Sequence, residues 1–115
     1  MGLDLTLLPF ADDTYSHTVL SCRRDSPLFD FIETLPSLDV PPNFNSYLSR
    51  DDKYEESHYG LTIKDAYGEQ LKYTTVKELL SMSSEFANNL SNKNKAVLAY
   101  LACLPNETKV ALYWC

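Results

Sequence analysis

The sequence predicts an α+β fold in which a four- to five-stranded mixed or antiparallel sheet packs against two main helices plus one short helix, as a two-layer sandwich. Three observations lead to this fold. Strand-like apolar segments open and close the chain, helical periodicity starts after recognisable cap residues, and no repeat or linker interrupts the sequence. The length of 115 residues fits a single domain over residues 1–115.

The first third of the chain predicts two strands and a short helix. Apolar and polar residues alternate over residues 3–8, which is the period of a strand, and Pro9 is expected to stop it. Residues 18–23 read as a second strand, antiparallel to the first. Ser26 and Pro27 form a cap and first-turn pair, and they predict a short amphipathic helix that ends before the next proline.

The middle of the chain predicts an irregular region followed by a hairpin. Residues 35–57 carry three prolines and one short strand-like segment at 44–48. Apolar segments at 60–63 and 71–74 then flank a turn in which Gly68 can adopt a positive φ. We therefore expect a hairpin that leads into the C-terminal part of the sheet.

The last third predicts two helices and a final strand. Thr75 opens a capping box, and apolar spacing continues through 76–90 as one helix of about three to four turns. Asn92 is expected to cap a second helix, whose run 96–104 is apolar on nearly all sides and so predicts a central position. Residues 109–114 form the last strand, and we expect it to share a sheet with the first.

Cysteine content favours a protein of the cytosol, and charge is distributed unevenly along the chain. The net charge is −6, and it is uneven: residues 1–57 hold 11 acidic and four basic side chains, a balance of −7, while residues 58–115 balance at +1. Cys22, Cys103 and Cys115 are odd in number and widely spaced, which fits a reducing compartment, and Cys103 is expected in the core. No apolar run reaches membrane-spanning length, so the expectation is a soluble protein.

The acidic balance indicates a class of partner. Phosphate backbones and anionic membranes require lysine and arginine for neutralisation, so neither a nucleic acid nor a membrane is the expected partner. A protein or protein complex with a basic surface suits the charge better. Charge that serves only solubility is the alternative, and a homo-oligomer stays open. The chain has three glycines and no phosphate-binding loop, and it predicts no cofactor.

The charged segment, residues 49–60, is the chemically densest part of the chain. Tyrosine and arginine are enriched at the energetic centres of interfaces, because they combine contact area with polar tips. The sequence therefore predicts a binding surface here rather than a catalytic or metal site. Its members are Arg50, Asp51, Asp52, Tyr54, Glu55, Glu56, His58 and Tyr59.

Two other readings of the same segment remain open. The carboxylates together with His58 and His17 supply ligands and an acid/base pair for a small metal-dependent nuclease or nucleotide hydrolase, although no defined ligand spacing is present. Alternatively, Arg23, Arg24 and Arg50 could bind phosphates while tyrosines stack on bases, so that the protein would sequester a nucleotide signal.

The overall pattern resembles small uncharacterised accessory proteins of tailed bacteriophages and prophages. The resemblance covers most of the chain and is carried by residues 2–10 and 16–20, by the charged segment and by residues 104–114. It transfers no catalytic residue. It implies the cytoplasm of an infected bacterium, and with it a non-enzymatic protein that binds and inhibits a host defence complex such as CRISPR.

Overall fold

The computed structural model describes residues 4–10, 15–16, 18–46, 50–51, 58–59 and 63–115 of the chain. In these residues five strands form one antiparallel sheet, which confirms the predicted α+β class. Their order across the sheet is β3 (Leu20–Ser21), β1 (Leu5–Phe10), β9 (Lys109–Trp114), β8 (Lys72–Thr75) and β4 (Leu38–Asp39). The first and last long strands are thus neighbours at the centre of the sheet, as the sequence predicts.

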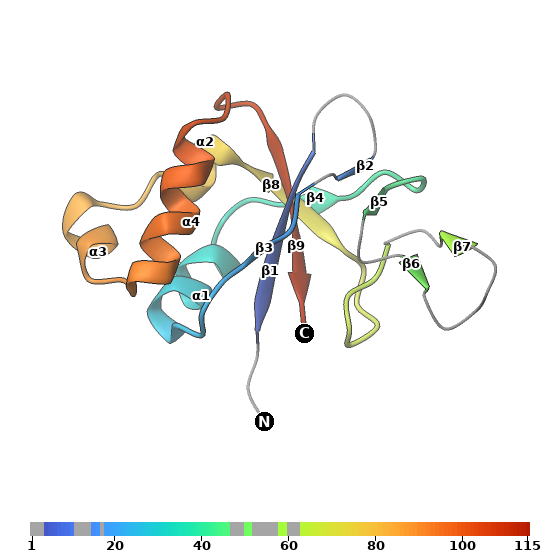
Figure 1. The fold of residues 1–115 in the computed structure, drawn as a ribbon, viewed down its shortest axis with the longest axis horizontal. Coiled ribbons are helices and arrows are strands. Elements are labelled where there is room, and N and C mark those ends of the chain that lie inside the picture. Colours follow the sequence, from blue (N-terminus) through green and yellow to red (C-terminus); the bar gives the residue numbers. More distant parts are fainter. Residues whose placement is uncertain (1–3, 11–14, 17, 47–49, 52–57, 60–62) are drawn as a thin grey trace.

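The described helices lie together on one side of the sheet (Figure 1). They are α1 (Ser26–Glu33), α2 (Val76–Leu79), α3 (Ser84–Asn88) and α4 (Asn92–Ala102). Two short strand pairs lie on the other side: β2 (Tyr15–Ser16) runs parallel to β5 (Asn45–Ser46), and β6 (Arg50–Asp51) runs antiparallel to β7 (His58–Tyr59). None of the described helices is long and apolar enough to cross a membrane.

Strand β1 is buried along its whole length, because apolar groups cover both faces of the sheet. Leu5 and Leu7 join Val110 and Leu112 in the helix-side core. Leu8 and Phe10 belong to a second core on the opposite face, where the Phe10 ring lies 4.7 Å from that of Phe44. The alternating side chains of one strand therefore supply two separate cores.

Pro9 does not end the first strand, contrary to the prediction. Asp4 and Cys115 exchange both backbone hydrogen bonds, and such pairs alternate along an antiparallel ladder. Pro9 therefore faces Val110 at a non-hydrogen-bonded position, where its missing N–H breaks no bond to β9. Its carbonyl points to the other side and accepts a hydrogen bond from the buried Ser16 hydroxyl at 2.8 Å.

The helix starts also differ from those expected. The cap residues of α1 and α4 each lie one position earlier in the chain than predicted, and a serine begins an extra helix. Asp25 rather than Ser26 caps α1, and Ser91 rather than Asn92 caps α4. Thr75 caps α2 as predicted, but the single helix expected over 76–90 is divided into α2 and α3. Ser83 accepts a hydrogen bond from the Phe86 N–H and starts a new helix, which offers the backbone an alternative to continuing α2.

Helix α4 packs along the β3 edge of the sheet and is not central. Its buried residues are Asn94, Val97 and Leu101, whereas Tyr100 is 44% exposed and Cys103 is exposed, so the core position predicted for Cys103 is wrong. Three of the five exposed residues in the run 96–104 are alanines, and alanine tolerates either environment, which is why hydropathy alone suggested burial.

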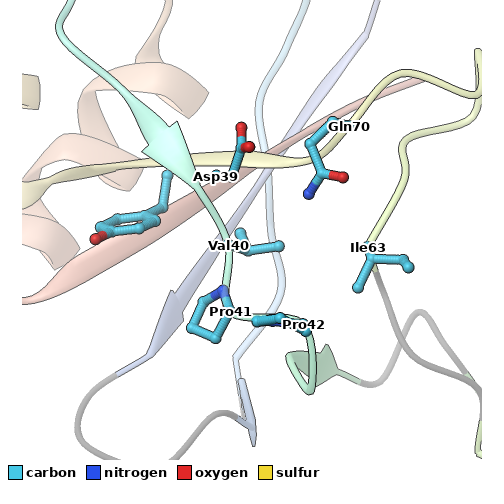
Figure 2. Close-up of a pocket in the computed structure, with 7 residues that line it drawn as sticks. Asp39, Val40, Pro41, Pro42, Ile63 and Gln70 are labelled. Carbon is cyan, nitrogen blue, oxygen red and sulfur yellow. The ribbon is translucent and has the colours of Figure 1, made fainter.

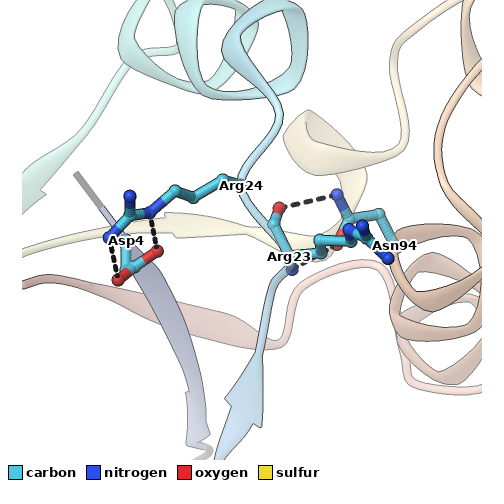
Figure 3. Close-up of polar contacts among 4 residues, drawn as sticks. All are labelled: Asp4, Arg23, Arg24 and Asn94. Atoms are coloured by element: carbon cyan, nitrogen blue, oxygen red, sulfur yellow. Dashed lines mark hydrogen bonds and ion pairs between the residues drawn. The ribbon is translucent and has the colours of Figure 1, made fainter. Parts of the chain in front are cut away.

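The Asn94 side chain binds the backbone at the end of the β3 edge (Figure 3). Its Oδ1 accepts the Arg23 N–H at 2.8 Å, and its Nδ2 donates to the Arg23 carbonyl at 2.9 Å. Because the Cys22 N–H already bonds to Leu5 in β1, Arg23 presents both groups to the outside of the sheet. The fully buried Asn94 amide thus takes the place that a neighbouring strand would occupy.

Replacing Asn94 with alanine should destabilise the fold by about 2 kcal/mol, because two hydrogen bonds are lost and buried polar groups lose their partners. The midpoint of urea unfolding measures this loss. Asn92→Ala on the exposed face of the same helix is the matched control, and it should change stability by about 0.5 kcal/mol or less. Equal midpoints for the two variants would contradict the role given to Asn94.

Candidate functional site

The two ends of the charged segment are paired in the structure. Strands β6 and β7 place Arg50 opposite Tyr59 and Asp51 opposite His58 in antiparallel register. These four residues, which the sequence predicts as part of one surface, are therefore brought together by backbone pairing. Asp52, Tyr54, Glu55 and Glu56 lie outside the described residues, as does His17 of the proposed acid/base pair.

The β6–β7 ribbon lies apart from the five-stranded sheet, at the end of the molecule opposite α3 and α4 (Figure 1). It is a separate two-stranded unit. A two-stranded ribbon alone is marginally stable in water, so the rest of the fold or a partner must support it. Among the described residues, its strands pair with each other and with no strand of the five-stranded sheet.

A hollow of about 460 Å³ lies at the β4 end of the sheet (Figure 2). We call it the β4 hollow, and it is lined by Asp39, Val40, Pro41, Pro42, Ile63, Gln70 and Tyr73. Its walls are mostly apolar, and Asp39 and Gln70 are polar residues among those that line it. Pockets of this size and character commonly receive small molecules or single side chains.

The β4 hollow forms beside Leu71, whose backbone N–H and carbonyl bind two different segments of the chain. The Leu71 carbonyl accepts a hydrogen bond from the Val40 N–H at 3.1 Å, while the Leu71 N–H donates to the Ile63 carbonyl at 2.9 Å. At Leu71, therefore, the neighbouring segment changes from the one that contains β4 to the one that contains Ile63, and these two segments diverge from each other. Figure 2 shows Val40 and Ile63 on separate segments with a gap between them.

Sequence reasoning did not find the β4 hollow, because its residues come from two segments that the pattern assigned to a loop and a hairpin. The turn of the predicted hairpin is confirmed, because Lys64 pairs with Gln70 and Gly68 has a φ of +81°, whereas residues 60–62 of its first arm lie outside the described residues. One local signal was present in the sequence. Pro41 and Pro42 follow β4 after a single residue, Val40, and consecutive prolines end strand pairing and present a rigid apolar surface.

Of the three arginines suggested for phosphate binding, Arg24 has its side chain engaged elsewhere in the structure. Arg24 binds the Asp4 carboxylate with two hydrogen bonds, of 2.7 and 3.1 Å, and this contact lowers the pKa of Asp4 (Figure 3). Arg23 is held through its backbone by Asn94. In the described residues, no three His, Cys, Asp or Glu side chains gather closely enough to hold a metal ion.

Comparison with protein-family models gave no match, and neither the curated proteins nor the solved structures include a significant match to this chain.

Among the cysteines, Cys22 is shielded and the other two are exposed. Burial against the helix-side core raises the pKa of the Cys22 thiol to about 11, and the opposing effect of the nearby Lys93 charge is smaller. Because the thiolate is the reactive form, Cys22 is a poor nucleophile at neutral pH.

The rate of alkylation should therefore distinguish Cys22 from the two exposed cysteines. At pH 8 a thiol of pKa about 11 is ionised to only about 0.1%. With iodoacetamide, the shielded Cys22 should therefore react much more slowly than the exposed Cys103 and Cys115, as measured by peptide mass spectrometry over time. In denaturant the three rates should converge, and equal rates in the native protein would contradict the burial of Cys22.

Proposed function

We propose that the protein acts by binding another protein, and that its partner is a host defence complex with a basic surface, such as a CRISPR complex, in a bacterium infected by a phage. The observation that carries the proposal is the register of the β6–β7 ribbon. It joins Arg50 to Tyr59 and Asp51 to His58 in one small unit outside the main sheet. The resemblance to phage accessory proteins supports the setting.

The residue types of the ribbon support binding to a basic protein. Arginine and tyrosine often provide most of the energy of an interface. The acidic balance of residues 1–57 favours encounter with a positively charged surface, because complementary charge raises association rates. The five-stranded sheet, whose two cores hold the central strands, supplies a stable base from which such a unit is presented.

The experiment begins with affinity capture from bacterial lysate to obtain the partner, followed by kinetic measurements with purified proteins. The Arg50→Ala, Tyr59→Ala double variant should bind at least about tenfold more weakly, because it removes two interface anchors. Its melting temperature should stay within a few degrees, since both residues lie outside the main sheet. The matched control is Lys93→Ala, Tyr100→Ala, which changes the same kinds of residue on α4 and should bind normally.

Charge provides a second readout in the same assay. Asp51→Lys should slow association, and the difference from wild type should shrink as salt rises, because salt screens long-range steering. Unchanged binding in the folded double variant would contradict the proposal. So would multiple turnovers of DNA, RNA or cyclic nucleotides with Mg²⁺ or Mn²⁺ that disappear in His58→Ala, since these would favour the nuclease or hydrolase reading.

A further inference from the structure

We propose that the β4 hollow is an anchor site for a short peptide segment of the partner, in which one apolar side chain enters the hollow and a neighbouring lysine or arginine binds Asp39. This inference rests on the proposed function and adds to it a second contact site and the chemistry of the segment bound there. The argument uses the shape, charge and position of the hollow.

Apolar walls and nearby exposed apolar area favour an apolar side chain as the occupant. Val40, Pro41 and Ile63 line the hollow. Leu38 in β4 is 65% exposed and pairs with Tyr73, another lining residue, so an apolar ledge continues beside the hollow. A large exposed aliphatic side chain beside an open apolar hollow is typical of an interaction site.

Asp39 selects for a positive charge next to that side chain. One of its carboxylate oxygens accepts a hydrogen bond from Lys72 at 2.8 Å, and the Asp39 and Lys72 side chains are 64% and 52% exposed. A carboxylate offers about four acceptor positions, so Asp39 can bind a second cation without losing the first. Because an exposed ion pair is weak, a partner's arginine can also replace Lys72 on Asp39 at little cost in free energy.

The backbone around the hollow favours a short segment over a long added strand. Leu38 and Val40 direct their backbone groups toward β8 and Leu71, so Asp39 presents its N–H and carbonyl to the open side of β4. Pro41 follows and has no N–H, so a pairing strand could not continue past it. The expected contact is one or two backbone hydrogen bonds around one anchored side chain.

The β4 hollow and the β6–β7 ribbon are close enough to bind one partner together. Tyr59 ends β7, and Ile63 of the hollow follows four residues later. Four residues of extended chain span at most about 14 Å. A partner held at the ribbon therefore reaches the hollow.

Defined peptides test this site without the natural partner. The probes are the capped octapeptides GSGLRGSG, GSGSRGSG and GSGLEGSG, titrated into the ¹⁵N-labelled protein while amide chemical shifts are followed. The leucine–arginine peptide should shift the amides of residues 39, 40, 63, 70 and 73. It should bind at least about tenfold more tightly than the serine peptide, because leucine burial is lost in the latter, and severalfold more tightly than the glutamate peptide.

Variants locate the binding chemistry. Ile63→Ser should abolish the preference for leucine, whereas Val19→Ser, which changes an exposed apolar residue near the β3 edge, should preserve it. Asp39→Lys should abolish the preference for arginine over glutamate. Asp30→Lys on the outer face of α1 makes the same change in net charge and should preserve that preference.

The outcomes separate this inference from the proposed function. Equal affinity for the three peptides, or shifts confined to residues outside the β4 hollow, would overturn the anchor site even if the Arg50, Tyr59 variant loses its partner. Leucine and arginine selectivity that disappears in Ile63→Ser and Asp39→Lys would support the anchor site whether or not the ribbon variant binds normally. Shifts that require a second copy of the chain, seen as concentration-dependent line broadening without peptide, would also overturn it.

Discussion

The pairing of β1 with β9 is the constraint on which the rest of the structure depends. Six register pairs join the first long strand to the last, and Asp4 and Cys115 extend the ladder by one more hydrogen-bonded pair. Because both strands bury side chains on both faces, the pairing fixes the helix-side core and the opposite core at once. A shift of one residue would exchange the two faces, so the register is strongly specified. Strand β3 extends this central pair on one side, and β8 and β4 extend it on the other.

The two edges of the sheet differ in whether their outward backbone groups are covered, and this difference links the fold to binding. At the β3 edge, the Asn94 amide satisfies the backbone of Arg23 and α4 packs alongside, so the end of that edge is closed. At the other edge β4 is short, Leu38 is exposed, and Pro41 prevents the addition of a long strand. The β4 hollow lies at this second edge, where the chain changes from β4 to the hairpin. One edge thus serves stability, while the other leaves room for a partner.

The sequence predicted those features that depend on local pattern and missed those that depend on long-range packing. Alternation and turn chemistry located the terminal strands, the hairpin with Gly68 and the cap at Thr75, because each is set by residues close together in the chain. Pro9 could not be placed inside a strand without the register of β9, and Asn94 could not be identified as an edge partner without Arg23, 71 positions away. The charged segment was recognised by composition, but the β4 hollow needed Val40 and Ile63 to be brought together in space.

Amide hydrogen exchange measured by NMR on the native protein tests this account most directly. The amides of Thr6, Leu8, Ala111 and Tyr113 should exchange slowest, since they lie at hydrogen-bonded positions of the β1–β9 ladder, which only global unfolding opens. The Arg23 amide should be clearly protected through Asn94, and the Asp39 amide should exchange far faster because it faces the open edge. Ladder amides that exchange as fast as Asp39, or an Asp39 amide as protected as that of Arg23, would contradict a structure built on the terminal strands with one closed edge and one open edge.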